Sequence, residues 1–481
     1  MTTYEVPMMK RKMKDIIKVP GSKSLSNRVL LLAAKSEGTS VVSGVQFSDD
    51  TRHFLQSLRD LGYELEIDEK NYQVTVHGCG RDIPKKKATI DVGSAGTGAR
   101  FLTSFLAFSD GEYEIQCSEQ MKKRPMMELF RTLEDLGVSF RYLEEKGHLP
   151  IKLRGLFSLS DEESSEENVL QAEEIVQKTY QLELDISRST QYLTAWLLTF
   201  AGSGVVGKIR VTSEKKTGTY IRMTMDLLKD FGVPVTFDGD TYVVDGREPI
   251  KAQDYQIEVD MSGACYFYAA AAILGGEVEV ENVRRDLHQG DLKFLDVLEQ
   301  MGCTVEEGEK GLRLKSPVET NHYVIHDAEG KERQYRFPVL HGVCINMNQF
   351  SDQALTLAAI APFADSVTEI TGIAHIRGQE CDRIHAIIEN LSTLGIRVEE
   401  LEDGVRIYPL EEAAYCDRLS LTFARQGLNK HLIHTYEDHR VAMSFTITGL
   451  RIPGIVIENP ECCRKTFENY FEIWDEILTE K

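Results

Sequence analysis

The chain has 481 residues, of which 42% are hydrophobic and 27% charged, and its formal net charge is −21. A chain of this length exceeds what one hydrophobic core supports, so we expect two or more domains. The acidic excess argues against nucleic acid or an anionic membrane surface as the main partner. Local clusters of Lys and Arg are therefore informative in this sequence.

The N-terminus, the apolar runs and the cysteines predict a cytoplasmic protein. The basic residues of 10–14 are not followed by an apolar segment, so we expect no signal peptide, and the longest apolar run, 265–274, is too short to cross a membrane. The nine cysteines form no CxxC or Cys/His spacing, which is typical of reduced thiols. His434 and His439 lie five residues apart without an HExxH motif, so no metal site is predicted.

In chain order, the first informative segment is Pro20–Arg28, which precedes the apolar run 29–34. This pattern predicts a turn that leads into a buried helix. Lys23, Arg28, hydroxyl groups and free backbone N–H groups would lie at the positive end of the helix dipole and favour an anion. A capped helix with solvated charges fits the spacing equally well.

Two kinds of predicted helix alternate along the chain. One kind is amphipathic and ends at a Gly suited to the left-handed position after a helix; these are Gly62, Gly137, Gly232, Gly302 and Gly395, and a sixth copy covers 467–478. The other kind is apolar on nearly all sides and therefore buried; its copies begin near Lys23, Gly96, Thr190, Ser262, Asp352 and Asp438. With short strands between them, these helices indicate one repeated unit used six times, three in each of two domains.

If the six buried helices begin near one another, their positive ends favour a small polyanionic ligand between the domains. Two stretches interrupt the repeat. We expect 160–174 to be a solvated insertion and 310–342 to be an extra hairpin or loop.

Several of these predicted helix starts carry polar motifs with two interpretations each. Residues 91–100 resemble a glycine-rich phosphate loop but match neither common nucleotide motif, so a tight turn into a packed helix is favoured on this segment alone. Ser189–Gln191 offers neutral donors for a phosphate, or caps a helix. Arg124 and Lys465 lie in basic clusters, which are usually solvated.

Carboxylates at other helix starts are candidate general acids or bases. Asp352 would otherwise be an N-cap, and Glu380 would otherwise belong to a surface ion pair. His439 and Arg440 begin a buried helix, where the charge needs a partner because an unpaired buried charge is costly.

Taken in order, these motifs resemble the 5-enolpyruvylshikimate-3-phosphate synthase (3-phosphoshikimate 1-carboxyvinyltransferase) family of enolpyruvyl transferases. The resemblance runs from about Lys18 to Leu478. It rests on the motifs 20–28, 48–51, 95–100, 124–125, 189–191, 289–291, Asp352, 380–383, 438–440 and 465–467.

The resemblance implies an α/β (α+β) fold of two domains, each with three repeated βαβαββ units and buried parallel helices. One domain would be 21–258, on the shikimate 3-phosphate side. The other would be 1–20 plus 259–481, with the catalytic carboxylates and the phosphoenolpyruvate carboxylate. The family also implies a monomer that closes around its substrates, with no cofactor, metal, nucleic acid or membrane partner.

The implied reaction joins the enolpyruvyl group of phosphoenolpyruvate to the 5-hydroxyl of shikimate 3-phosphate and releases phosphate, on the way to chorismate and the aromatic amino acids. The implied catalytic residues are Asp352, Glu380, Lys23 and His439. The implied shikimate 3-phosphate residues are Lys23, Ser24, Arg28, Ser189, Thr190, Gln191, Thr217, Tyr220, Asp352, His375 and Gln379. The implied phosphoenolpyruvate residues are Lys23, Gly96, Arg124, Gln191, Arg383, Arg440 and Lys465.

The sequence departs from the family pattern at Ser94, Phe101, His375 and Gln379, and keeps only part of the motif around 217–220. Two alternatives stay open. One is a UDP-N-acetylglucosamine enolpyruvyl transferase, although Cys117 lies in a predicted strand and not in the loop expected of that enzyme. The other is a non-catalytic anion-binding homologue.

Overall fold

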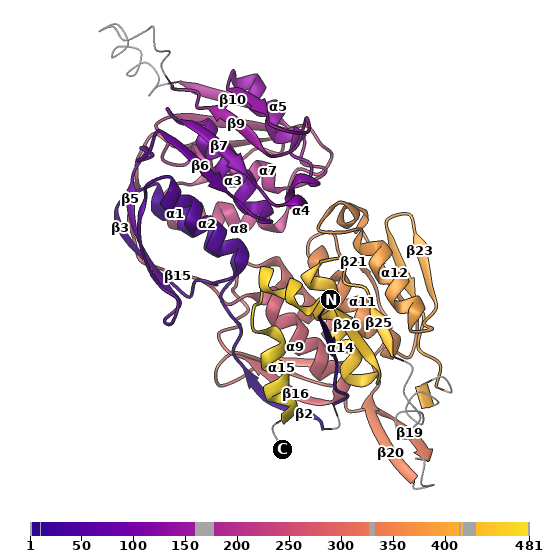
Figure 1. Cartoon of the computed structure of the whole chain (residues 1–481). Coiled ribbons are helices and arrows are strands. Elements are labelled where there is room, and N and C mark those ends of the chain that lie inside the picture. The colour runs from indigo at the N-terminus through magenta and orange to yellow at the C-terminus, as the bar shows by residue number, and fades with distance from the viewer. Residues whose placement is uncertain are drawn as a thin grey trace, which may run out of the picture. The chain divides into compact units, whose positions relative to one another are not determined.

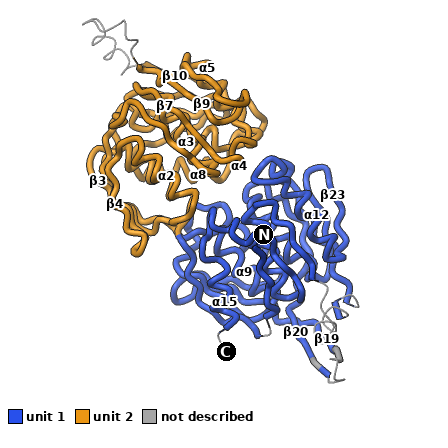
Figure 2. Tube along the Cα trace, in the orientation of Figure 1, with its two compact units in different colours: residues 1–20, 259–481 blue, residues 21–258 orange. Residues whose placement is uncertain are grey.

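The computed structural model describes residues 2–9, 11–158, 178–326, 332–412, 415–416 and 430–479 (Figure 1). The chain divides into two compact units: unit 1 comprises Met1–Pro20 and Val259–Lys481, and unit 2 comprises Gly21–Glu258 (Figure 2). The chain therefore passes between the units twice. Backbone hydrogen bonds flank both passages: Ser22 N donates to Glu258 O within unit 2, and Asp260 N donates to Pro20 O within unit 1, each at 2.8 Å.

Unit 2 contains three repeats. The first has helices α1 (Lys23–Ala34) and α2 (Asp49–Asp60) and strands β3 (Ser36–Ser43), β4 (Glu64–Asp68), β5 (Gln73–Cys79), β14 (Ile250–Lys251) and β15 (Tyr255–Gln256). The second has α3 (Gly96–Ala107), α4 (Glu119–Lys122), α5 (Met127–Leu136), β6 (Lys87–Asp91), β7 (Glu112–Gln116), β8 (Ser139–Tyr142) and β9 (Ile151–Arg154). The third has α7 (Gln191–Phe200), α8 (Thr219–Asp230), β10 (Thr179–Leu184), β11 (Val206–Val211), β12 (Val235–Phe237) and β13 (Thr241–Asp245).

Unit 1 also contains three repeats. The first has β2 (Met13–Ile17), α9 (Met261–Leu274), β16 (Gly276–Val280), the 3-10 turn η1 (Gly290–Leu292), α10 (Lys293–Gln300), β17 (Thr304–Glu307) and β18 (Leu312–Lys315). The second has β21 (Cys344–Asn346), η2 (Ser351–Gln353), α11 (Ala354–Ile360), η3 (Ala361–Phe363), β22 (Thr368–Thr371), η4 (Ala374–Gly378), α12 (Arg383–Thr393), β23 (Val398–Leu401) and β24 (Gly404–Ile407). The third has β25 (His431–Ile433), α14 (His439–Arg451), β26 (Ile455–Glu458), η5 (Pro460–Lys465), α15 (Tyr470–Thr479) and the N-terminal strand β1 (Thr3–Glu5).

The repeats share one sheet topology. The sheet β10-β11-β13-β12 is representative, because β10 and β11 are parallel and β13 pairs antiparallel with both β11 and β12. The sheets β6-β7-β9-β8, β17-β18-β16-β2 and β21-β22-β24-β23 have the same arrangement. The last repeat takes its outer strand from the other end of the chain, since β1 pairs antiparallel with β26.

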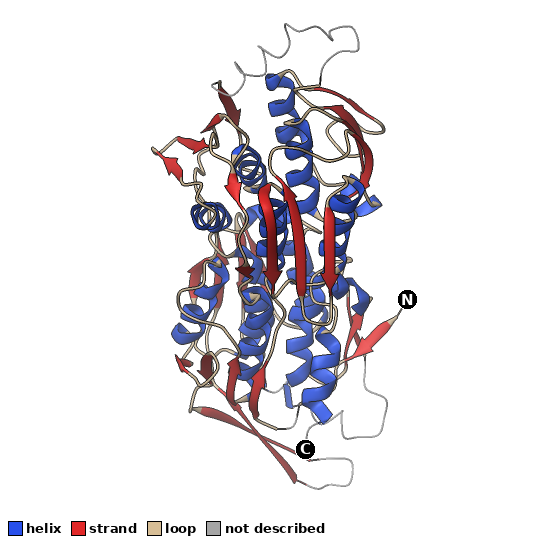
Figure 3. Cartoon of the chain, turned by 90° about the vertical axis from the view of Figure 1, so that its left-hand side faces the viewer, coloured by secondary structure: helices blue, strands red, loops and turns tan. Residues whose placement is uncertain are grey.

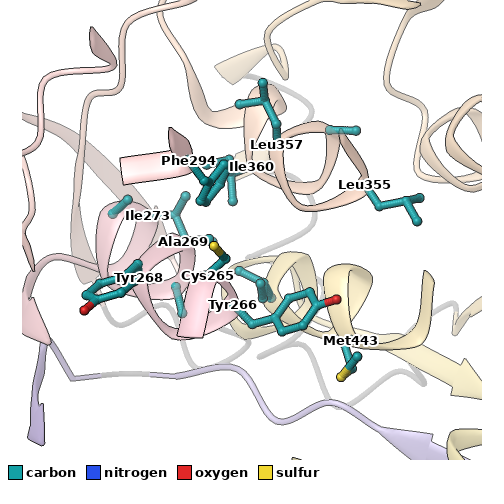
Figure 4. Packing of buried hydrophobic residues seen from close by; sticks show 14 of the residues in the cluster. Cys265, Tyr266, Tyr268, Ala269, Ile273, Phe294, Leu355, Leu357, Ile360 and Met443 are labelled. Atoms are coloured by element: carbon teal, nitrogen blue, oxygen red, sulfur yellow. The ribbon is translucent and has the colours of Figure 1, made fainter. Parts of the chain in front are cut away.

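The apolar helix of each repeat lies in the core of its unit. In unit 1, α9, α11 and α14 pack through residues such as Tyr266, Leu357 and Met443 (Figure 4). In unit 2, α1, α3 and α7 form the corresponding core. Strands lie over these helices, as the turned view shows (Figure 3). Because the helices are enclosed, their polar first turns are the parts at which a ligand can meet the helix dipoles.

The two predicted helix types are confirmed. All five glycines predicted to follow the amphipathic helices have positive φ, from 67° at Gly395 to 103° at Gly302. The sixth amphipathic helix begins at Tyr470, three residues after the predicted start, because Pro460–Lys465 forms a 3-10 turn ahead of it.

The two insertions have different outcomes. The predicted interruption at 310–342 begins too early, because Leu312–Lys315 forms β18 of the repeat. The inserted part is the antiparallel hairpin of β19 (Thr320–His326) and β20 (Glu332–Pro338). The insertion at 160–174 lies outside the described residues. Within the described ranges, no helix combines the length and the apolar character needed to cross a membrane.

Candidate functional site

The first polar helix start of unit 2 belongs to α1, and its first residue is Lys23. The Lys23 ammonium lies 3.0 Å from a carboxylate oxygen of Asp50, which is itself buried in the first turn of α2. Asn27, one turn further on, donates to the Thr97 hydroxyl of α3 at 2.8 Å. The starts of α1, α2 and α3 are therefore linked by polar side chains.

Arg28 is a buried cation whose hydrogen-bond acceptors are neutral. Its Nε donates to the Thr224 hydroxyl of α8 at 2.9 Å, and an Nη donates to the Ser24 carbonyl at 2.6 Å. The guanidinium also lies 5.1 Å from the Phe101 ring centroid. Burial lowers the pKa of Arg28 to about 10, so the residue stays positively charged at neutral pH. Such a charge is stabilised further when an anion binds beside it.

Gly96 starts α3 and lies against two guanidinium groups. A Cβ at this position would lie 2.5 Å from Nη1 of Arg124 and 2.6 Å from Nη1 of Arg100. Glycine is therefore the residue that lets both cations approach the helix start. Arg100 also donates to the Gly96 carbonyl at 3.1 Å and to Oε1 of Gln191 at 2.7 Å, which links α3 to α7.

Ser189–Gln191 lies at the start of α7, where the N-cap residue Thr190 makes no side-chain cap hydrogen bond. The Ser189 hydroxyl accepts the Gln191 backbone N–H at 3.3 Å, and the Gln191 side chain contacts Arg100. A Cβ on Gly218, just before α8, would lie 3.3 Å from the Thr190 methyl group, so the two helix starts are neighbours. Thr217 lies in that turn, and the Tyr220 ring centroid is 5.9 Å from the Arg28 guanidinium.

In unit 1, an ion-pair network surrounds Arg383, the first residue of α12. Arg383 is 1% exposed and contacts the carboxylates of Asp438 at 2.8 Å, Glu380 at 3.0 Å and Asp352 at 3.1 Å. These charges raise the pKa of Arg383 further above its ordinary value despite the burial. Because each carboxylate comes from a different segment, Arg383 joins η2, the segment after η4, and the start of α14.

Asp352 and Glu380 each contact two cations. Asp352 lies 3.0 Å from Arg440 as well as beside Arg383, and Glu380 lies 3.3 Å from Lys465 as well as beside Arg383. The interpretation of Asp352 as a simple N-cap is therefore wrong, because Gln353 precedes α11 and the Asp352 carboxylate is engaged with arginines. Glu380 does not belong to a surface ion pair either, since its side chain is only 11% exposed.

The start of α14 combines a cap, a buried histidine and strained backbone. Asp438 accepts the Arg440 backbone N–H at 2.9 Å and pairs with Arg383, so it serves as cap and counter-ion. His439 is buried, with Nδ1 3.7 Å from the Asp438 carboxylate. Tyr436 and Glu437, immediately before, have φ of 54° and 58°, a conformation that favours glycine and is often retained at functional sites.

The remaining predicted residues of unit 1 lie in or next to two 3-10 turns, η4 and η5. Nε2 of His375 is 2.8 Å from the Ser351 hydroxyl, next to Asp352. Gln379, where the family pattern has Lys, accepts a hydrogen bond from Arg383 through Oε1. Lys465 ends η5 and is buried, in contrast to the solvated cluster expected from its neighbours.

Four residues without a predicted role form ion pairs or hydrogen bonds with the candidate site residues or their neighbours. They are Asp50, Arg100, Asp291 and Asp438. All four lie inside motifs noted in the sequence. The signal that could have found Asp50 and Asp438 is the need of Lys23 and Arg383 for a counter-ion. Across the described residues, no group of three or more His, Cys, Asp or Glu side chains is arranged to hold a metal ion.

Similarity to known proteins extends over nearly the whole chain. Residues 8–474 match the family described as EPSP synthase (3-phosphoshikimate 1-carboxyvinyltransferase). A 3-phosphoshikimate 1-carboxyvinyltransferase of Trichormus variabilis is 34% identical over 472 residues, covering 98% of each chain. A protein of Halalkalibacterium halodurans named 3-phosphoshikimate 1-carboxyvinyltransferase 2 is 34% identical over 480 residues, covering 99% of this chain and 94% of the relative.

Solved structures share the fold. An EPSP synthase from Acinetobacter baumannii matches with a TM-score of 0.73 and 24% identity, covering 99% of this chain and 98% of that one. The enolpyruvyl transferase NikO from Streptomyces tendae matches with a TM-score of 0.66 and 15% identity, covering 98% and 96%. The expected two-domain enolpyruvyl transferase fold is thereby confirmed, and the chain belongs to the EPSP synthase (3-phosphoshikimate 1-carboxyvinyltransferase) family.

Proposed function

We propose that the groups at the helix starts of the two units carry out the transfer that defines this family. In that reaction the enolpyruvyl group of phosphoenolpyruvate passes to the 5-hydroxyl of shikimate 3-phosphate, and phosphate is released. The family match over residues 8–474 supports this activity and its place in the shikimate pathway. The assignment of roles to individual residues is our proposal, and it rests on the contacts described above.

The chemistry is an addition followed by an elimination. In the addition, the 5-hydroxyl oxygen bonds to C2 of phosphoenolpyruvate while C3 gains a proton and the hydroxyl loses one. In the elimination, the bond from C2 to the phosphate oxygen breaks and C3 loses a proton, which restores the double bond. The enzyme must therefore accept and donate protons at two positions, a task for positioned side chains rather than for one group.

The groups of unit 2 suit anion binding. We assign shikimate 3-phosphate to Lys23, Ser24, Arg28, Ser189, Thr190 and Gln191, with Thr217 and Tyr220 beside them. Gly96 and Arg124 serve the phosphate of phosphoenolpyruvate, and Lys23 and Gln191 contact both substrates. The Arg28 contacts support this assignment, because a buried guanidinium with neutral acceptors gains most from an anionic partner.

The groups of unit 1 suit proton transfer and carboxylate binding. Asp352 accepts the proton of the 5-hydroxyl, and Glu380 exchanges the proton at C3, supported by Lys23 and His439. Arg383 and Arg440 receive the phosphoenolpyruvate carboxylate, since two guanidinium groups flank Asp352 and present planar donors. Lys465 receives the phosphate, and His375 and Gln379 lie on the acceptor side. In the free protein, the Asp352 and Glu380 carboxylates pair with Arg383, Arg440 and Lys465, the cations that we assign to the anionic substrate.

Two alternatives are weaker. Family membership does not favour the UDP-N-acetylglucosamine enzyme. The strand predicted around Cys117 ends at Gln116, so Cys117 itself lies just outside it. A binding protein without catalysis would not need both Asp352 and Glu380 within an ion-pair network. We further propose that the protein is a cytoplasmic monomer that binds no nucleic acid, in keeping with its net charge of −21.

The direct test is release of inorganic phosphate from shikimate 3-phosphate plus phosphoenolpyruvate by the purified full chain. We expect turnover with this pair and none when UDP-N-acetylglucosamine replaces the acceptor. Folded protein that releases no phosphate with shikimate 3-phosphate would overturn the proposal. Turnover with the sugar nucleotide alone would support the other transferase instead.

A further inference from the structure

A closed ring of polar contacts in unit 1 contains a buried carboxylate that has no role in the proposed mechanism. Asp291, in η1, is 6% exposed. One of its oxygens accepts hydrogen bonds from the Ser262 hydroxyl of α9 and from Nε2 of Gln353, the latter at 3.1 Å. The Ser262 oxygen lies 3.4 Å from an Nη of Arg440, and Arg440 pairs with Asp352, the neighbour of Gln353 in the chain.

We propose that Asp291 is a positioning residue that fixes Asp352 and Arg440 relative to each other for the enolpyruvyl transfer. The inference rests on the proposed function, because that function assigns proton transfer to Asp352 and carboxylate binding to Arg440. Asp291 itself acts through Ser262 on one side and through Gln353 on the other.

The directions of the hydrogen bonds explain why a carboxylate occupies this place. The Ser262 hydroxyl has one proton and donates it to Asp291, so its oxygen is left to accept from Arg440. The Gln353 amide donates to Asp291 through Nε2 and accepts the Thr356 hydroxyl through Oε1 at 2.9 Å, so its orientation is fixed at both ends. An ionised carboxylate only accepts, and it can therefore receive both bonds at once.

The charges around Asp291 couple it to the same two residues. The charges of Asp352 on η2 and Arg440 on α14 both shift the pKa of the Asp291 carboxyl. The Cys265 thiol of α9 is also near, 3.6 Å from the Asp291 backbone carbonyl. Burial and then the charge of Asp352 raise the pKa of Asp291, while Arg440 opposes the rise. The Asp291 carboxyl therefore responds to the charge of Asp352, the residue whose position it is proposed to fix.

The first test is steady-state kinetics of Asp291→Asn, Ser262→Ala and the double variant in the full chain, with Asp365→Asn as a matched control. Asp365 is another hydrogen-bonded aspartate of unit 1, but it is exposed, lies beside His341 and belongs outside the ring. An amide at position 291 can still accept both bonds through its oxygen, but it removes the negative charge that faces Arg440 and Asp352. Since small displacements of reacting groups have large kinetic effects, we expect kcat to fall about 10- to 100-fold.

The double variant separates positioning from a general loss of stability. Because both substitutions break the same ring, the double variant should be no slower than the slower single variant. Binding of shikimate 3-phosphate by calorimetry and the urea midpoint of Asp291→Asn should stay near wild type. The proposal is overturned if Asp291→Asn keeps the wild-type kcat, or if the two effects on kcat multiply. If Asp291→Asn does not fold, an unchanged kcat in Ser262→Ala overturns it equally.

A second measurement does not depend on turnover. The carboxyl ¹³C resonance of Asp291, assigned through the Asp291→Asn variant, is titrated in the wild type and in Asp352→Asn. We expect its midpoint to fall in Asp352→Asn, because the neighbouring negative charge is removed. An unchanged midpoint would overturn the coupling. If the wild type releases no phosphate while the midpoint falls, the proposed function fails and the ring stands.

Discussion

The arginines at the helix starts of the two units have different partners. In unit 2, Arg28 is held by a hydroxyl and a carbonyl group, and Arg100 donates to an amide oxygen and to a carbonyl oxygen. In unit 1, Arg383 is surrounded by three carboxylates, and Arg440 and Lys465 each contact one. Both units are built from the same repeat and contain the same kind of buried helix. The difference therefore lies in the side chains at the helix starts.

This difference separates binding from chemistry. A cation with neutral partners keeps its attraction for a phosphate, whereas a cation shared with carboxylates holds those carboxylates in place. We therefore assign tight recognition of the phosphorylated acceptor mainly to unit 2 and proton transfer mainly to unit 1. The following predictions test that division, beginning with the largest effect.

Glu380→Gln should abolish most of the chemistry and leave acceptor binding intact. The amide keeps the shape of the side chain but cannot exchange a proton at C3, so we expect kcat for phosphate release to fall about 10²- to 10⁴-fold. Calorimetric titration with shikimate 3-phosphate should give nearly the wild-type affinity. A kcat within a factor of three of wild type would remove Glu380 from the mechanism.

Arg383→Met and Arg28→Met should differ in stability. Loss of Arg383 leaves the buried Asp438 without its cation, which destabilises by about 3–5 kcal/mol. Loss of Arg28 removes hydrogen bonds to neutral groups, each contributing about 0.5–1.5 kcal/mol. The two tryptophans, Trp474 in unit 1 and Trp196 in unit 2, are both buried and can report urea unfolding of each unit in single-tryptophan variants. Equal losses of stability would contradict the difference described above.

Lys35 should make the stability of unit 2 depend on pH. Its ammonium donates to the carbonyls of Leu198 and Thr199, at the end of α7, at 2.6 and 2.7 Å. Burial lowers the pKa of Lys35 to about 7, against about 10.4 in an unfolded chain. Between these pH values the unfolded state holds the extra proton, so the free energy of unfolding should rise with pH by at most about 1.4 kcal/mol per unit.

Urea unfolding at pH 7, 8 and 9, followed through Trp196, measures this slope. Lys35→Met should remove the pH dependence. The unfolding transition reported by Trp474 should not change with the substitution, because Trp474 belongs to the other unit. An identical slope in wild type and Lys35→Met would show that Lys35 is not the titrating group.

Gly96→Ala should have the smallest effect and should concern phosphoenolpyruvate alone. The new methyl group would meet the Arg124 and Arg100 guanidinium groups, which are the ends of long side chains and can move. We expect KM for phosphoenolpyruvate to rise about tenfold, equivalent to about 1.4 kcal/mol, with little change in stability. An equal rise in KM for shikimate 3-phosphate would mean that this helix start serves both substrates.

The repeat was predictable because its signals are local. An apolar residue followed by Gly marks the end of each amphipathic helix, and the positive φ at Gly62 and Gly137 follows from that position. The pairing of the N-terminal strand Thr3–Glu5 with Ile455–Glu458 was not predictable, because it depends on contacts between opposite ends of the chain. Short strands give no signal for such distant partners.

The candidate site was likewise predictable only where its signals are local. Lys23, Asp352 and Arg440 became candidates because charged residues stood at apolar helix starts. Glu380 became one as a carboxylate ahead of an amphipathic helix, and the motif resemblance gave each a role. The ring through Asp291 was not predicted, since Gln353 lies 62 residues further along the chain and meets it only in the folded unit. The same applies to Asp50, whose contact with Lys23 spans 27 residues.

The central claim is the division between acceptor binding and proton transfer, and Asp352→Asn tests it most directly. Binding of shikimate 3-phosphate by calorimetry and release of phosphate should be measured on the same preparation. We predict nearly wild-type affinity for shikimate 3-phosphate, together with a fall in kcat of about 10²-fold or more. Wild-type turnover, or a loss of affinity as large as the loss of turnover, would contradict the account.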